Sequence, residues 1–323
     1  MKGRLLFLDI AKAICIVLVV VGHYVPDTSP RWWKELHDVI YYFHMPMFMY
    51  ASGFIYNSAT QKSYGSFLWK KFKRLLVPYF VTSFVVITIK LLMQGVAFVE
   101  NQVSLMSYIQ VFYIPSAGAF LWFVWALWWM FVIVPLFQGK SKHLLLLIFS
   151  FCLLLMPFEL TSVFCINALK NYLFYFMLGV VASDYRSIWY DKCPIFGVFL
   201  FLFLVILKDL FGYYIPMVLL SMIGIFMVLQ VSSFLCKYGS ALLKNVMINL
   251  SLSSYCIYLF HTTFEGFAKA VVVKVPWLSN GASDVGFVIG AFLCIVSGVF
   301  VPIVVQKVIL ERFELTKFLF GLK

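Results

Sequence analysis

Long apolar segments recur along the chain and decide what it can fold into. A helix needs about 20 mostly apolar residues to cross the hydrocarbon core of a bilayer. Backbone groups in hydrocarbon must be bonded within the protein, which favours helices for segments of this length. We therefore expect an all-α, polytopic integral membrane bundle of about ten transmembrane helices. The predicted segments are 5–25, 39–56, 75–93, 119–137, 144–158, 169–183, 194–208, 213–235, 246–265 and 285–306.

The composition excludes a soluble fold. Hydrophobic residues make up 63% of the chain and charged residues only 12%, with a mean hydropathy of +0.98. Soluble domains carry about 25% charged residues, so a soluble fold would leave much of this apolar surface uncovered. No stretch between the apolar segments is long enough for a separate soluble domain. We expect a single transmembrane domain over residues 1–323.

The basic residues predict an orientation. With ten spans, most of the 25 Lys and Arg residues fall in segments on the same side as the N-terminus. Cytoplasmic loops are enriched in Lys and Arg, so both termini are expected in the cytoplasm. The net charge of +12 is thereby explained. It is spread over short loops without a compact basic face, so we expect no nucleic-acid partner.

The start of the chain could be mistaken for a signal peptide, because Lys2 and Arg4 precede an apolar stretch. Asp9 and Lys12 interrupt that stretch and no small-residue cleavage site follows, so we expect it to be retained. The seven cysteines are an odd number without paired spacing. We expect neither a disulfide nor a metal site.

Three ionisable residues share one side of the first apolar segment. Asp9 lies one helical turn before Lys12, and His23 returns to nearly the same direction about 16 Å further along the axis. Charges inside membrane helices normally face a protein interior or a water-filled cavity. We expect all three to be catalytic, with His23 as general base. A structural ion pair with an interfacial histidine remains an alternative.

A second histidine and a basic run could also serve chemistry. We also expect His44 to be catalytic. It lies in an apolar segment near Pro46, which would loosen the helical ladder and expose carbonyls; a kinked packing helix with an interfacial histidine is the alternative. The basic run comes just before segment 75–93. Clustered cations suit the phosphates of a cofactor such as coenzyme A (CoA), and equally a topology anchor on anionic lipid headgroups. The run is Lys70-Lys71-Phe72-Lys73-Arg74.

Two later segments could also line a binding site. One is rich in tryptophan and includes Trp122, and the other includes His261. We expect Trp122 to contact a bound cofactor and His261 to contact a bound substrate. Trp-rich segments are more often packing or an interfacial belt, so that alternative stays open.

Seven motifs follow one another along the chain: Asp9-Ile-Ala-Lys12, Gly22-His23, Phe43-His44-Met-Pro-Met-Phe48, Ser52-Gly53, Arg74-Leu-Leu-Val-Pro78-Tyr79, Phe120-Leu-Trp-Phe-Val-Trp125 and Ser254-Tyr-Cys-Ile-Tyr-Leu-Phe-His261. In this order they resemble the membrane-bound acyltransferase family 3, and within it the fucose 4-O-acetylase-like branch of stand-alone enzymes. The family's signature in the first helix is an arginine, ten residues and a histidine, and here Lys12 stands in place of the arginine. The family's paired arginines at the inner mouth appear as Lys71 and Arg74.

The resemblance implies a multi-pass O-acyltransferase of the cell inner (plasma) membrane. Such an enzyme moves an acyl group, usually acetyl, from cytoplasmic acetyl-CoA to a sugar hydroxyl of a surface polysaccharide or its lipid-linked precursor. It would place the CoA phosphates at Lys71, Lys73 and Arg74. His23 would act as general base or acyl carrier. A transporter or flippase for a lipid-linked sugar, using Asp9, Lys12 and His23 as a polar path, is the rival interpretation.

Overall fold

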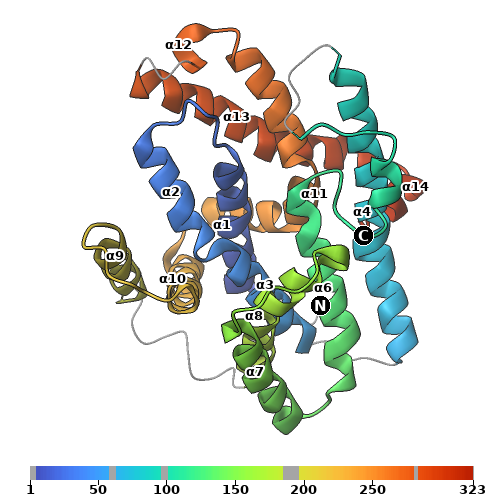
Figure 1. Ribbon diagram of the computed structural model, residues 1–323, viewed down its shortest axis with the longest axis vertical. Coiled ribbons are helices and arrows are strands. Elements are labelled where there is room, and N and C mark those ends of the chain that lie inside the picture. The colour runs from blue at the N-terminus through green and yellow to red at the C-terminus, as the bar shows by residue number, and fades with distance from the viewer. Residues whose placement is uncertain (1–4, 58–62, 96–100, 185–195, 280–282, 323) are drawn as a thin grey trace. The chain divides into compact units, whose positions relative to one another are not determined.

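The computed structural model describes residues 5–57, 63–95, 101–184, 196–279 and 283–322, and within these ranges every regular element is a helix (Figure 1). The expected all-α fold is confirmed. Six helices of the described chain are long and apolar enough to cross a membrane, three of them extended by short 3-10 or π turns. The protein is therefore a multi-pass membrane protein. The six are α1 (Leu6–His23), α4 (Tyr64–Met93), η1–α6–η2 (Ala119–Leu136), η3–α8 (Val163–Asp184), α10 (Met217–Tyr238) and α13–η4 (Asp284–Leu310).

The other four predicted segments differ from a plain span. Helices α7 (Lys140–Leu155) and α9 (Phe196–Asp209) have only 16 and 14 residues, and the first two residues of segment 194–208 lie outside the described residues. Helix α11 (Ala241–Val272) has 32 residues but is not among the six. Its polar side chains lower its hydropathy. The fourth segment, 39–56, is divided.

The division of segment 39–56 corrects the sequence prediction. Helix α2 (Arg31–Tyr41) ends and α3 (His44–Asn57) begins shortly after it, so no continuous helix covers the segment. Pro46 is then in the first turn of α3. Pro46 has no N–H to donate to the carbonyl of Tyr42 four residues earlier, and that carbonyl accepts the Ser221 hydroxyl at 2.6 Å instead. The proline thus loosens the helical ladder and leaves a carbonyl available, as predicted, and the segment divides at this point.

A second correction concerns the basic run. Helix α4 begins at Tyr64, well before the predicted start at 75. The run therefore lies inside a helix and not in a loop before one. Helical spacing makes Lys70 a neighbour of Lys73 and Arg74, and Lys71 a neighbour of Arg74. The remaining short elements are α5 (Ser107–Gln110), α12 (Pro276–Ser279) and α14 (Glu314–Leu319).

The chain forms two compact units, each assembled from distant segments. The first comprises Met1–Ser52 with Tyr185–Ile303, and the second comprises Gly53–Asp184 with Val304–Lys323. In the first unit, α1 packs along α11 and α10, and α9 packs on α10. In the second, α6 packs against α4 and α8, α7 packs on α8, and α14 packs on α4.

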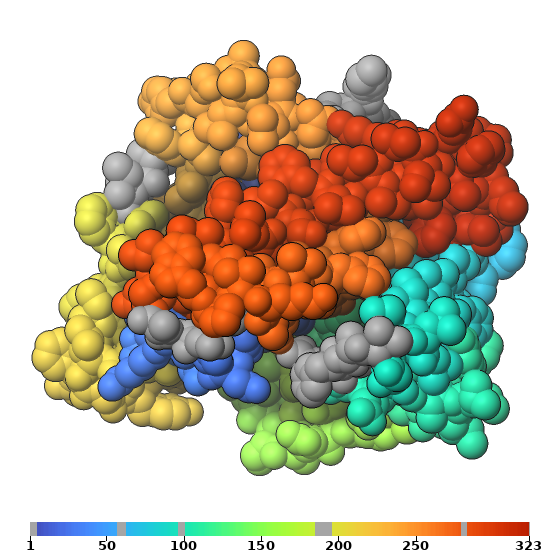
Figure 2. Space-filling view, turned by 90° about the horizontal axis from the view of Figure 1, so that it is seen from above, coloured from blue at the N-terminus to red at the C-terminus, as the bar shows by residue number. Residues whose placement is uncertain are grey.

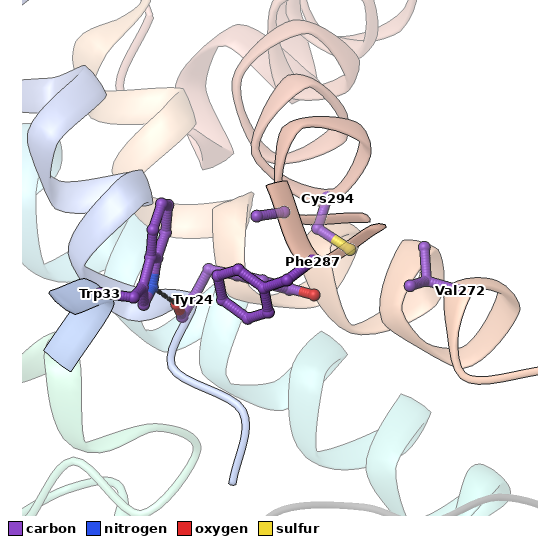
Figure 3. Close-up of a cluster of buried hydrophobic side chains, with 6 residues drawn as sticks. Tyr24, Trp33, Val272, Phe287 and Cys294 are labelled. Carbon is purple, nitrogen blue, oxygen red and sulfur yellow. Dashed lines mark hydrogen bonds between the residues drawn. The ribbon is translucent and has the colours of Figure 1, made fainter. Parts of the chain in front are cut away.

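A buried aromatic cluster holds the ends of four helices together in the first unit (Figure 3). The indole of Trp33, in α2, donates a hydrogen bond to the carbonyl of Tyr24 at 2.7 Å, just after α1 ends. Phe287, from α13, packs edge-on against Trp33 with ring centroids 5.3 Å apart. Val272 adds the end of α11. This cluster sets where α1 ends, and His23 is the last residue of α1.

Helix α9 presents large apolar side chains outward. It lies at the edge of the space-filling view, in yellow (Figure 2). Its exposed residues include Phe199, Leu202, Phe203 and Ile206. An exposed apolar surface of this kind suits lipid better than water. The exposed face of α9 is thus consistent with a membrane protein.

Helix α13 approaches its neighbours in the first unit at Gly298, which gives a stability prediction. A Cβ added there would lie 2.7 Å from Glu265 Cγ and 2.9 Å from Val20 Cγ1. Small residues allow membrane helices to pack this closely. We expect Gly298→Ala to cost about 1–3 kcal/mol of overpacking and to lower the thermal midpoint in detergent, followed with a thiol-reactive dye on the buried cysteines.

Gly266→Ala is the matched control. Among the described residues, no atom of a neighbouring group lies within 4 Å of a Cβ added at Gly266. Glycine inside a helix is less stable than alanine by roughly 0.5–1 kcal/mol, so this variant should keep or raise the midpoint. Equal midpoints for the two variants would contradict close packing at Gly298.

Candidate functional site

The expected ion pair is present on α1. Lys12 Nζ lies 3.3 Å from Asp9 Oδ1, one helical turn away. Ser251 of α11 donates its hydroxyl to the same carboxylate oxygen at 2.8 Å. Asp9 is buried, and a buried carboxylate needs a cation or hydrogen-bond donors to stay charged. The polar residue Ser251 of α11 therefore has a role within the apolar bundle, because it binds the carboxylate of Asp9 on α1.

The end of α1 meets α11 at a pair of histidines. The rings of His23 and His261 lie 5.0 Å apart, with an interplanar angle of 56°. His261 is fully buried, and its Nδ1 is 2.8 Å from the carbonyl of Tyr258 and 3.1 Å from that of Ile257. A carbonyl can only accept, so Nδ1 donates the proton and the lone pair of the neutral ring is on Nε2. This is the form in which imidazole acts as a base.

His44, at the start of α3, makes the same kind of hydrogen bond as His261. It is buried, and its Nδ1 donates to the carbonyl of Ile40 at 2.7 Å. In an unbroken helix that carbonyl would accept from the backbone N–H of residue 44. The break between α2 and α3 makes it available to the imidazole. The ring of Tyr41 lies between the histidines, with centroids 4.7 Å from His44 and 6.4 Å from His23.

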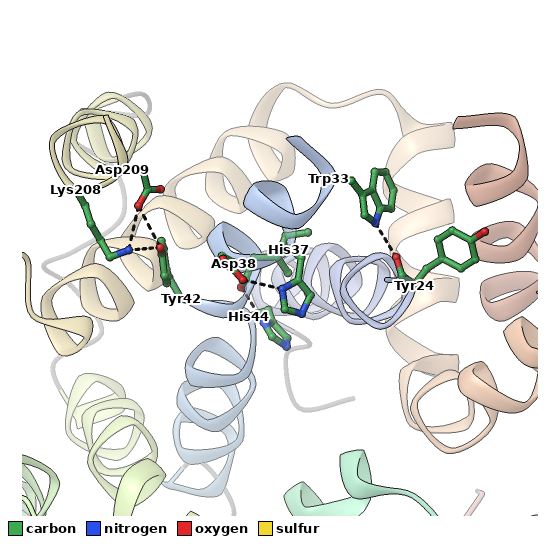
Figure 4. Close-up of polar contacts among 9 residues, drawn as sticks. Tyr24, Trp33, His37, Asp38, Tyr42, His44, Lys208 and Asp209 are labelled. Atoms are coloured by element: carbon green, nitrogen blue, oxygen red, sulfur yellow. Dashed lines mark hydrogen bonds and ion pairs between the residues drawn. The ribbon is translucent and has the colours of Figure 1, made fainter. Parts of the chain in front are cut away.

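His37, Tyr41 and Glu265 also lie in or beside this cluster, and none of the three was predicted from the sequence. His37 packs on Tyr41 with centroids 4.1 Å apart, and its Nδ1 is 2.9 Å from Asp38 Oδ1 near the α2–α3 junction (Figure 4). Glu265 is buried on α11, four residues after His261. That spacing puts both on one helix face and was the available signal. No such signal pointed to Tyr41 or His37, because their contacts depend on where α2 ends and α3 begins.

The basic residues of α4 form a separate feature in the second unit. A pocket of about 240 Å³ is lined by Lys70, Lys73 and Arg74 together with Lys317 from α14. Lys71 does not line it; its ammonium lies 3.5 Å from the centre of the Phe131 ring. Trp122 is not in its lining either, and packs on Tyr172 with centroids 4.6 Å apart. The pocket thus brings together two of the four expected cofactor residues and adds two lysines.

A comparison with known families decides the class. A family model described as an acyltransferase domain matches residues 5–307. The protein belongs to acyltransferase family 3. The histidine cluster and the basic pocket both lie within or beside the matched residues of this acyltransferase. In the described part of the chain, no group of three or more His, Cys, Asp or Glu side chains is arranged to hold a metal ion.

One curated relative shows how far the similarity extends. Nodulation protein NolL of Mesorhizobium japonicum (strain LMG 29417 / CECT 9101 / MAFF 303099) is 29% identical to this acyltransferase over 139 residues. The match covers 41% of this chain and 36% of NolL, so it spans little more than a third of the relative. No solved structure matches the chain.

Proposed function

We propose that this acyltransferase moves an acyl group, acetyl in the simplest case, from cytoplasmic acyl-CoA to a sugar hydroxyl of a surface polysaccharide or its lipid-linked precursor. The observation that supports this best is the pair of His23 and His261, with ring centroids 5.0 Å apart, in a chain of an acyltransferase family. A neutral imidazole is suited to take a proton from a hydroxyl, and the lone pair on Nε2 of His261 provides an acceptor for a sugar beside His23.

In the proposed reaction His23 removes the acceptor's hydroxyl proton while the oxygen attacks the thioester carbonyl. The C–S bond breaks, the acyl group becomes an ester, and the histidine returns the proton to the CoA thiolate. The alternative is that His23 first carries the acyl group itself. His44 and His261, whose Nδ1–H groups are used by backbone carbonyls, would accept through Nε2 from other hydroxyls of the same sugar. Lys12 lies about 16 Å from His23 along α1, so we assign it to orienting the cofactor, with Asp9 keeping it charged.

We further propose one domain over residues 1–323 in the cell inner (plasma) membrane, with ten spans and both termini cytoplasmic. Helices α3, α7, α9 and α11 would add four spans to the six. The distribution of Lys and Arg favours this orientation. Six of these basic residues lie outside the described residues, namely Lys2, Arg4, Lys62, Arg186, Lys192 and Lys323.

The test of the function is transfer of label. Purified protein in nanodiscs is incubated with acetyl-CoA labelled in the acetyl group and with a glycan extract from the source cells. Label in the glycan supports the enzyme, and NMR of the product identifies the acylated hydroxyl. Movement of glycan across vesicles without label would instead identify a flippase.

Arg74→Ala is expected to raise the KM for acyl-CoA at least several-fold. Arg74 lines the basic pocket, and its guanidinium can bind a phosphate through two hydrogen bonds. Higher ionic strength should weaken acyl-CoA binding to the unaltered protein as well. Lys142→Ala, which removes an exposed cation of α7, is the control. An unchanged KM in Arg74→Ala would favour a topology anchor.

A further inference from the structure

The basic pocket of the second unit is built from two helices far apart in the sequence. Three of its cations come from α4, and the fourth, Lys317, comes from α14. Phe318 and Gly321 complete this side of the lining. The expected basic run therefore supplies only part of the pocket. Helix α14 was not predicted to have any role.

The end of α14 is fitted closely onto α4. Gly321 has a φ of +64°, and a Cβ there would be 2.9 Å from both the carbonyl oxygen of Arg74 and Pro78 Cγ. Only glycine adopts this conformation without strain and leaves this space. The hydroxyl of Thr316 donates to the carbonyl of Leu310 at 2.7 Å, which holds the start of α14. The position of Lys317 beside Arg74 thus follows from specific contacts.

The charge of the pocket predicts an anionic ligand. Four cations gather around it. Lys317 Nζ lies 2.6 Å from Glu314 Oε1, and that carboxylate is largely exposed. Like charges at short range repel, and a phosphate relieves that repulsion through charge-assisted hydrogen bonds. The pocket thus suits a phosphate group.

The size and the lining narrow the class of ligand. A cavity of about 240 Å³ is smaller than the roughly 300–1,000 Å³ that encloses a whole drug-sized ligand, so it holds one end of a larger molecule. Phe318 lines the pocket and is 49% exposed. Nucleic acid bases stack on exposed aromatic rings of this kind. Phosphate and base together describe a phosphorylated nucleoside.

We propose that this pocket binds the phosphorylated adenosine end of CoA, with Lys317 contacting the 3′-phosphate and Phe318 stacking on the adenine. The proposal rests on the proposed function, since it takes acyl-CoA as the donor. The phosphate of an anionic lipid headgroup would use the same cations but has no base to stack on Phe318. The two sources therefore differ in what Phe318 contributes.

The test is the affinity of the purified full chain, in phosphatidylcholine nanodiscs, for CoA, dephospho-CoA and pantetheine. The unaltered protein should bind CoA about tenfold more tightly than dephospho-CoA, which lacks the 3′-phosphate. Lys317→Ala should remove most of that difference, whereas Lys317→Arg should keep it. Phe318→Ala should weaken CoA and dephospho-CoA by the same factor and leave pantetheine unchanged.

Two more variants and a measurement of phosphatidylglycerol binding distinguish a CoA site from a lipid site. Lys307→Ala removes an exposed cation that does not line the pocket and should keep every affinity. Gly321→Ala should displace α14 and reproduce the loss seen in Lys317→Ala. Labelled acetyl transfer with unchanged affinities in the Lys317 and Phe318 variants would overturn this proposal and leave the function standing. Lys317-dependent binding of phosphatidylglycerol without an effect on CoA would overturn it in favour of a lipid site. If the unaltered protein does not bind CoA at all, the proposed function is wrong in taking acyl-CoA as the donor.

Discussion

Replacing His23 with alanine is expected to abolish glycan acylation while the protein still reaches the membrane in normal amount. Removal of a general base typically lowers a rate by roughly 10²–10⁴-fold. His23 ends α1 beside His261, with centroids 5.0 Å apart, and interacts with Tyr41 at 6.4 Å. The measurement is transfer of labelled acetyl to the glycan, normalised to protein amount in the membrane.

His143→Ala is the matched control, because it removes an imidazole from the second unit. His143 lies on α7, 3.6 Å from the carboxylate of Asp184, and takes no part in the histidine cluster. It should keep turnover per molecule, even if the buried pair makes the variant less abundant. Near-normal acylation in His23→Ala would remove His23 from the mechanism.

Lys12→Met is expected to eliminate activity and to lower the amount of protein. The substitution leaves the buried carboxylate of Asp9 without its ammonium partner at 3.3 Å, and only the Ser251 hydroxyl at 2.8 Å remains among these two contacts. Loss of one partner of a buried ion pair costs about 3–5 kcal/mol. Lys12→Arg should keep measurable activity, because it keeps the charge. Membrane abundance and labelled transfer are measured side by side.

The double variant Asp9→Asn with Lys12→Met separates stability from catalysis. The amide oxygen that the first substitution introduces can still accept from Ser251, and the pair no longer contains a buried charge without its partner. Abundance should therefore recover while activity does not. Full transferase activity in the double variant would show that Asp9 and Lys12 form only a structural ion pair.

The cofactor residues show what helical spacing could and could not predict. The sequence placed Lys71, Lys73 and Arg74 together, but α4 begins early enough for the whole run to be helical. A helix divides neighbouring residues among its faces, so Lys71 turns to Phe131 while Lys70, Lys73 and Arg74 share the pocket. Lys317 carries no local signal, because only the fold of α14 onto α4 brings it there.

The sequence predicted the class of the protein, because its hydropathy indicates an all-α membrane fold and its ordered motifs indicate the family. It also predicted the pair of Asp9 and Lys12, because residues one turn apart on a helix are neighbours whatever surrounds them. Three contacts could be recognised only in the folded protein: Ser251 shares this carboxylate, His261 meets His23, and Tyr41 contacts both His23 and His44. Those contacts join residues on different helices, and helical periodicity describes each helix alone. Which faces meet is set by side-chain packing between helices, such as the close approach of α13 at Gly298.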